Sequence, residues 1–226
     1  MRPHIHAYPE IPDGPITEIW HAEKWRKEMD LRLLSPMYAD GARHYYVLEF
    51  ARLKNGEFVV PARWLTHKGH VKADVFQVKK FSDGTVSIDV GQTAQVDASE
   101  LQDTYPELVD QGLVPVCRDG KIVQLLSHHF THRWGTDDSK TMSAKMPNPD
   151  REIAGGLPLY TNFIDYFGDD VSGNRSKAWN KHWNSYTSHR NLPRKLLQQE
   201  FHVHFLSSSP NATIPEQLQV FINTVE

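Results

Sequence analysis

The chain has 226 residues, enough for one large domain or two small ones. Hydrophobic residues make up 39% of it, which predicts a buried core and argues against disorder throughout. The net charge of −3 excludes a histone-like or coat protein, which would be strongly basic. Cys117 is the single cysteine, and no stretch of eighteen apolar residues occurs. We therefore expect an intracellular protein without a membrane partner.

The first 126 residues are predicted to form a β-rich module. Residues 1–16 contain four prolines and a glycine, which indicates an extended arm, and Thr17 can cap a helix over residues 18–29. Four strands are predicted from runs rich in Val, Phe, Tyr and Trp, over residues 45–51, 58–65, 71–79 and 86–90. The dipeptides Asn55-Gly56 and Asp83-Gly84 are hairpin signals. This pattern predicts a small antiparallel barrel or curled sheet, followed by a short helix over residues 99–108.

Residues 127–154 are predicted to be a linker, because they are polar, contain Gly and Pro, and lack periodicity. An α/β segment over residues 155–226 follows. Its predicted elements are strands over residues 157–167, 185–188 and 201–207, a helical turn over residues 195–200, and a helix that begins near Ile214. The predicted fold class of the whole chain is therefore α+β.

Charge is distributed unevenly along the chain. Residues 85–116 contain six acidic residues and no Lys or Arg, whereas residues 171–205 contain six cations and one acid, Glu200. This asymmetry predicts two functional regions, of which the acidic one would suit a basic protein partner.

Asp169 and Asp170 follow an apolar run that is predicted to be a strand. Two-metal nucleases place their first carboxylate ligand at such a position, because a strand end fixes the oxygen donors that Mg²⁺ or Mn²⁺ requires. The alternative is an Asp-rich turn without a metal, and such turns are common. The pair remains a candidate for the first metal ligand.

The segment that follows interleaves cations with tryptophans. Lys and Arg can neutralise phosphates, and Trp can stack on unpaired bases, so this segment is a candidate nucleic-acid-binding region. Its candidate residues are Arg175, Lys177, Trp179, Lys181, Trp183, Arg190, Arg194 and Lys195. The alternative is a solvated basic loop that two tryptophans anchor.

Two groups of histidines are candidate metal ligands. His202 and His204 alternate on a predicted strand, so both imidazoles would share a face and could hold a divalent metal, with Tyr186 as a conceivable nucleophile. The alternative is the polar face of a half-buried strand. The other group consists of Cys117, His128, His129 and His132, and its spacing matches no compact structural zinc pattern.

Several blocks of the chain resemble a recurrent segment of large proteins of basidiomycete fungi. These blocks are Pro158-Leu159-Tyr160, Asp169 through Asn174, Lys177, Trp179 through Asn184, Asn191 through Arg194 and Gln198 through Phe205, together with Pro3-His4-Ile5, Asp13-Gly14-Pro15 and Trp20 through Trp25. The fungal proteins are similar to products of cut-and-paste DNA transposons of the CACTA and Kyakuja–Dileera–Zisupton groups.

This resemblance implies an RNase H-like core with three acidic metal ligands, the first of them at Asp169 or Asp170, and it implies DNA as a partner and a nuclear location. The other two ligands are expected beyond Glu226, so the segment is expected to be an incomplete RNase H-like fold and the isolated chain not to cleave DNA. Three functions remain open: a transposon-derived nucleic-acid-binding protein, an active metal-dependent DNA nickase, and a protein-interaction module.

Overall fold

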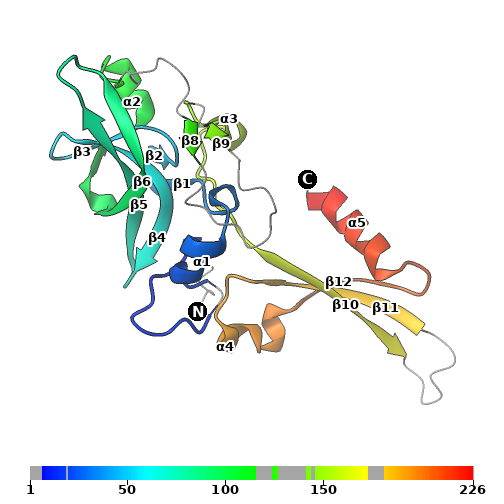
Figure 1. Ribbon diagram of the computed structural model, residues 1–226. Helices are drawn as coiled ribbons and strands as arrows, with labels where there is room; N and C mark the ends of the chain where they lie inside the picture. Colours follow the sequence, from blue (N-terminus) through cyan, green and yellow to red (C-terminus); the bar gives the residue numbers. More distant parts are fainter. Residues whose placement is uncertain are drawn as a thin grey trace. The chain divides into compact units, whose positions relative to one another are not determined.

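A computed structural model describes residues 7–18, 20–115, 124–126, 141–143, 146–172 and 181–225 (Figure 1). The chain forms two compact units, and the boundary between them lies between Thr161 and Asn162. Both units combine strands with helices, which confirms the predicted α+β class. None of the described helices is long and apolar enough to cross a membrane.

The N-terminal unit contains fourteen described elements. They are α1 (Ala22–Glu28), η1 (Leu31–Leu33), β1 (Met37–Asp40), β2 (Arg43–Tyr46), β3 (Ala51–Leu53), β4 (Phe58–His67), β5 (His70–Lys80), β6 (Val86–Asp97), η2 (Ala98–Glu100), β7 (Leu101–Asp103), α2 (Tyr105–Asp110), β8 (Gln124–Leu126), β9 (Thr141–Ser143) and α3 (Asp150–Ala154).

The main feature of this unit is a five-stranded antiparallel sheet of order β6-β5-β4-β3-β7. Figure 1 shows β4, β5 and β6 as long, curved strands, as the prediction of a curled sheet requires. Seven consecutive residues of β4 are buried, which means that the strand is covered on both faces. Trp64 of β4 is 1% exposed and packs in a core with Tyr45 and Val75.

The sheet curves where its pairing is irregular, and three of the predicted elements differ from the observed ones. The β5–β6 register passes from Asp89 to Thr93, so β6 continues to Asp97 beyond the predicted end at residue 90. The predicted strand over residues 45–51 is interrupted at Leu48, which has a φ of 62°. The predicted helix over residues 99–108 is three elements, because Pro106 lies at the start of α2, where a proline needs no N–H partner.

The helix α1 is attached to the sheet through a buried ion pair. Nε of Arg26 donates to Oδ2 of Asp74 at 3.0 Å, and Nη2 donates to Oδ1 at 3.0 Å. Arg63 of β4 lies 3.6 Å from the same carboxylate, and burial lowers the pKa of its guanidinium. The helix begins at Ala22, four residues later than predicted, and Thr17 donates its backbone N–H to Nδ1 of His21.

A second buried ion pair holds α3 to the N-terminal unit. Glu49 is 1% exposed, and Arg151 of α3 donates to its two carboxylate oxygens from Nε and Nη2, both at 2.7 Å. The backbone N–H of Asn148 donates to the same carboxylate at 2.7 Å. Part of the segment expected to be a linker, residues 127–154, is therefore folded onto this unit, and β9 also lies within it. The unit extends to Thr161, seven residues beyond the predicted linker.

The C-terminal unit is a three-stranded antiparallel meander with a helix on one face. Its elements are β10 (Ile164–Ser172), β11 (Lys181–His189), α4 (Arg194–Leu197), η4 (Glu200–His202), β12 (His204–Ser209) and α5 (Ile214–Val225). The sheet order is β10-β11-β12, and α5 contacts β10 and β11. The order of elements is the one predicted, but β10 begins seven residues later than expected. Leu157, at the start of the predicted strand, is 70% exposed and precedes the sheet.

Gly168 allows α5 to approach β10 closely. A Cβ atom at this position would meet the side chain of Ile214 from α5 and would lie 2.9 Å from the backbone oxygen of Asn184. A larger residue would require the Ile214 side chain and the Asn184 backbone to shift, so the glycine permits the close approach of the helix to the sheet.

Replacing Arg151 with Ala should destabilise the N-terminal unit by about 3 kcal/mol, because the buried carboxylate of Glu49 would lose its charged partner. Guanidinium denaturation followed by circular dichroism measures the change. Glu152→Ala, at the neighbouring exposed position of α3, is the matched control and should leave the unfolding free energy nearly unchanged. Equal effects of the two variants would contradict the assigned role of Arg151.

Replacing Gly168 with Val should destabilise the C-terminal unit by about 1–3 kcal/mol, because the new side chain collides with Ile214 of α5 and with the backbone oxygen of Asn184. Asp169→Val places the same side chain on the same strand but on the opposite face, and should cost much less. Hydrogen exchange of the β10 and β11 amides reports on this unit alone. Equal protection in the two variants would contradict the close packing at Gly168.

Candidate functional site in the C-terminal unit

The C-terminal sheet has two chemically different faces, because successive side chains of a strand point to opposite sides. Gly168 faces α5, and its register partner Ser185 bonds to Gln217 of that helix. We call this the covered face. The residues at alternating positions, among them Phe167 and Tyr186, point to the other side, which we call the open face.

Asp169 and Asp170 lie within β10 rather than after it, because the strand continues to Ser172. The prediction that they follow the end of a strand is therefore wrong: the ladder with β11 pairs Asp169 with Asn184 and Asp170 with Trp183. As neighbours in a strand, the two aspartates point to opposite faces, Asp169 to the open face and Asp170 to the covered face. Both are exposed. The two carboxylates therefore cannot hold one ion together. The assignment of either one alone as a metal ligand remains a prediction.

Polar contacts fix α5 on the covered face. Ser185 is fully buried, and its hydroxyl lies 2.6 Å from that of Ser207 and 3.1 Å from Oε1 of Gln217. Nε2 of Gln217 donates to the backbone oxygen of Trp183 at 2.9 Å. Tyr166 packs on Phe221 of the helix with ring centroids 5.7 Å apart. The covered face beside Asp170 is therefore taken up by contacts between α5 and the sheet.

An aromatic row crosses the open face, one ring from each strand. The rings of Phe167 and Tyr186 are stacked with centroids 5.5 Å apart, and those of Tyr186 and Phe205 meet edge to face at 5.8 Å. Phe167 is 43% exposed and Phe205 is 59% exposed. Sequence reasoning missed this row, because it depends on the register that places three residues from distant segments opposite one another.

The predicted nucleic-acid-binding residues are only partly brought together. Arg194 and Lys195 are exposed in α4, and Arg190 donates from Nη1 to Oδ2 of Asp165 at 2.7 Å. Lys181 is the first residue of β11. Trp183 is half-buried on the covered face, so stacking on a base is not the role that its position favours. Three further candidates lie outside the described residues: Arg175, Lys177 and Trp179.

His202 and His204 do not share a strand, which corrects the prediction of a common face. His202 ends the 3₁₀ helix η4 and is 3% exposed, whereas His204 begins β12 and is exposed. His189 of β11 lies near both: its ring centroid is 6.0 Å from that of His204, and Asn162 donates from Nδ2 to its Nδ1 at 2.7 Å. Burial lowers the pKa of His189, and the nearby His204 and His202 lower it further.

Metal binding receives no further geometric support from the part of the chain that the structure describes. Within those residues, no three or more His, Cys, Asp or Glu side chains are arranged to hold a metal ion. Cys117, His128, His129 and His132, which were considered for zinc, lie outside the described residues.

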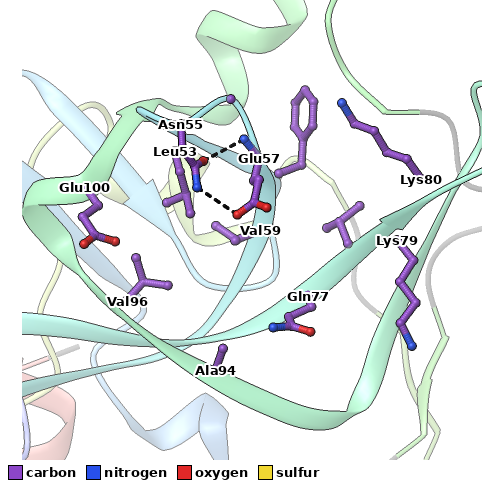
Figure 2. A pocket seen from close by; sticks show the side chains of 13 residues that line it. Leu53, Asn55, Glu57, Val59, Gln77, Lys79, Lys80, Ala94, Val96 and Glu100 are labelled. Atoms are coloured by element: carbon purple, nitrogen blue, oxygen red, sulfur yellow. Dashed lines mark hydrogen bonds between the residues drawn. The ribbon is translucent and has the colours of Figure 1, made fainter.

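A hollow of about 610 Å³ lies on the curled sheet of the N-terminal unit (Figure 2). Its apolar lining includes Leu53, Val59 and Val96, and its polar lining includes side chains of both signs. Figure 2 shows the turn residue Asn55 bonded to Glu57, with the Asn55 side chain donating to the Glu57 carboxylate and accepting from its backbone N–H, both at 2.9 Å. This turn therefore forms one wall of the hollow.

Three of the six acidic residues in the stretch 85–116 form ion pairs within their own unit. Asp89 pairs with Lys79 at 2.7 Å, Asp103 with Arg52 at 2.6 Å, and Glu107 with Arg43 at 3.0 Å. Asp97 accepts from the backbone N–H of Ser99 and so caps η2. The negative charge of this segment is thus less available to a basic partner than the sequence indicates.

The stability of the C-terminal unit should fall as the pH is lowered below 6.5, the ordinary pKa of histidine. In that range the unfolded chain binds a proton at His189, whereas the folded unit does not, because folding lowers the pKa of this histidine. The loss of stability ends once the pH falls below the pKa of His189 in the folded unit. His189→Gln should show a weaker pH dependence of the unfolding free energy between pH 7.5 and 5.5. His70→Gln, at an exposed histidine of the other unit, should leave the dependence unchanged. Identical slopes for the His189 variant and the parent chain would contradict this assignment.

Comparison with known proteins places the N-terminal unit in a family. No curated protein and no solved structure matches the chain. The profile of a family described as "Domain of unknown function (DUF8591)" matches residues 37–160. The match spans more than half of the chain, and it ends one residue before the boundary of the N-terminal unit at Thr161. The chain therefore belongs to the DUF8591 family.

Proposed function

We propose that this protein is a transposon-derived nucleic-acid-binding protein, and that its C-terminal unit corresponds to the first part of an RNase H-like core. The sequence resemblance described above supports the relationship. The order of elements is also compatible with it, since three antiparallel strands are followed by a helix on one face of the sheet. DNA is the proposed partner and the nucleus the proposed location.

A binding role is favoured over cleavage by the geometry of the two aspartates. A two-metal mechanism needs several carboxylates that converge on the same pair of ions. Asp169 and Asp170 point to opposite faces of β10, so either face receives one carboxylate from the pair, and no group of three or more His, Cys, Asp or Glu side chains among the described residues is arranged to complete a metal site there. We therefore propose that this chain binds nucleic acid without cleaving it.

The observation that carries the proposal is the placement of cations at both ends of β11. Lys181 begins the strand, and Arg194 and Lys195 follow its other end in α4. The strand spans about 26 Å at 3.3 Å per residue. This length corresponds to about eight base pairs of a duplex, so cations at its two ends can contact phosphates that are well separated on one nucleic acid.

A second candidate function, a protein-interaction module, is favoured by the hollow in the N-terminal unit. Its lining combines an apolar surface with Lys79, Lys80 and Glu100, as in a protein interface with an apolar centre and a polar rim. Because the family match covers this unit, such a function would be a property of the family domain rather than of the C-terminal unit.

The test is duplex DNA binding by the full chain at several salt concentrations. A variant with Ala at Lys177, Lys181, Arg194 and Lys195 should bind more weakly, and the slope of log K against log salt should fall by about 0.9 for each phosphate that the variant no longer neutralises. The matched control replaces four exposed lysines of the other unit, Lys24, Lys27, Lys54 and Lys68, and changes the net charge equally. Equal weakening in both variants, or no binding at low salt by the parent chain, would reject the proposal.

A further inference from the structure

The open face of the C-terminal sheet is an exposed apolar surface. Phe167, Tyr186 and Phe205 form the row across its centre, and Val171 adds a further side chain that is 43% exposed. The helix α5, which contacts β10 and β11, lies on the covered face and leaves the aromatic row uncovered. A three-stranded sheet with one bare aromatic face is typical of a surface that another molecule covers.

The two ends of this face carry different charges: one end has an Arg–Asp pair and the other a single carboxylate. Arg190, which pairs with Asp165, lies at one end, beyond Ser188 of β11. Asp169 lies at the other end, two residues past Phe167. Three charged side chains thus border the aromatic row, and two of them are carboxylates. Phosphates would meet those carboxylates, so the face itself is poorly suited to nucleic acid.

We propose that the open face pairs with the open face of a second copy of this chain. A twofold axis that lies between the sheets and runs perpendicular to the strands reverses the strand direction of one copy relative to the other. Arg190 of each copy then lies over the β11 residue that pairs with Asp169 in the other copy, about one strand spacing (~4.8 Å) from Asp169 and within reach of an arginine side chain, and the aromatic rows lie between the two charge pairs. Such an interface is self-complementary, as a twofold contact must be.

The dimensions of the sheet allow this arrangement. At about 3.3 Å per residue, Asp169 lies about 7 Å from the aromatic row in one direction, and Arg190 lies about 13 Å from it in the other. A twofold axis midway between the two charges passes about 3 Å from the row, so the aromatic rings of the two copies are offset and can interdigitate. Sheets packed face to face are about 10 Å apart, a gap that Phe and Tyr side chains from both sides fill.

This pairing does not depend on nucleic-acid binding, and oligomeric state tests it directly. Sedimentation equilibrium of the full chain over a range of concentrations should show a dimer. Phe167→Ser combined with Phe205→Ser should raise the dissociation constant at least tenfold, with circular dichroism to confirm that the sheet is retained. Asp169→Arg and Arg190→Asp should each do the same, because each variant places like charges opposite one another in its own dimer.

Mixing the two charge variants gives the decisive measurement. Copies with Asp169→Arg and copies with Arg190→Asp form a heterodimer in which each of the two charge pairs again joins an arginine to an aspartate. The equimolar mixture should therefore recover association to within a few fold of the parent chain. Glu200→Arg and Arg194→Asp, at exposed charges outside the open face, are the control pair and should leave dimerisation unchanged both alone and mixed.

Three results would overturn the inference. The first is a parent chain that remains monomeric at every concentration. This result would overturn the inference even if the monomer bound a single-stranded oligonucleotide through its aromatic row. The second is a dimer that persists in the Phe167→Ser, Phe205→Ser variant. The third is a mixture of charge variants that stays dissociated. Duplex binding that depends on Lys195 can survive each of these results, so the failure of this inference is distinguishable from the failure of the proposed function.

Discussion

The close packing of α5 on β10 at Gly168 determines what each face of the C-terminal sheet can do. Because Gly168 lies directly beneath Ile214 of α5, the residues at even positions of β10 face the helix side. The alternation of the strand then sends Phe167 and Asp169 to the opposite side. The separation of the two aspartates and the bare aromatic row are therefore two consequences of one constraint.

Polar contacts make this constraint specific. Ser185 and Ser207 both bond to Oε1 of Gln217, and Nε2 of Gln217 bonds to backbone oxygens of Trp183 and Ala212. A buried amide with these partners fixes the rotation of α5 about its axis, because another rotation would break the bonds of Gln217 to the serines and to the two backbone oxygens. The apolar contacts of Tyr166 with Phe221 alone would tolerate more variation.

The sequence predicted elements best where local chemistry decides them. The turns at Asn55-Gly56 and Asp83-Gly84 correctly located β4 and β5, and the apolar spacing after Ile214 located α5. It failed where tertiary contacts decide. The Arg151–Glu49 pair, which joins residues 102 apart in the chain, folds part of a polar segment that has no periodicity onto the N-terminal unit.

The candidate site shows the same division. The exposed cations of α4 could be predicted from composition alone, whereas the positions of His202 and of the aromatic row could not. His202 lies outside the strand because residues 200–202 form the 3₁₀ helix η4 and β12 begins only at His204. Phe167, Tyr186 and Phe205 are scattered in the sequence, and only the β10–β11 and β11–β12 registers align them.

The two proposals for the C-terminal unit use different residues and are physically compatible. Nucleic-acid binding depends on cations that include Lys195 in α4, whereas pairing depends on Phe167 and its neighbours in the open face. Pairing would place two sets of these cations in one particle, and two linked binding surfaces raise the effective affinity for a long polyanion without any new contact. The acidic and basic residues of this unit nearly balance, so its net charge alone predicts weak binding to nucleic acid. A dimer would bind more tightly than a single copy, because two linked sets of cations contact the same polyanion.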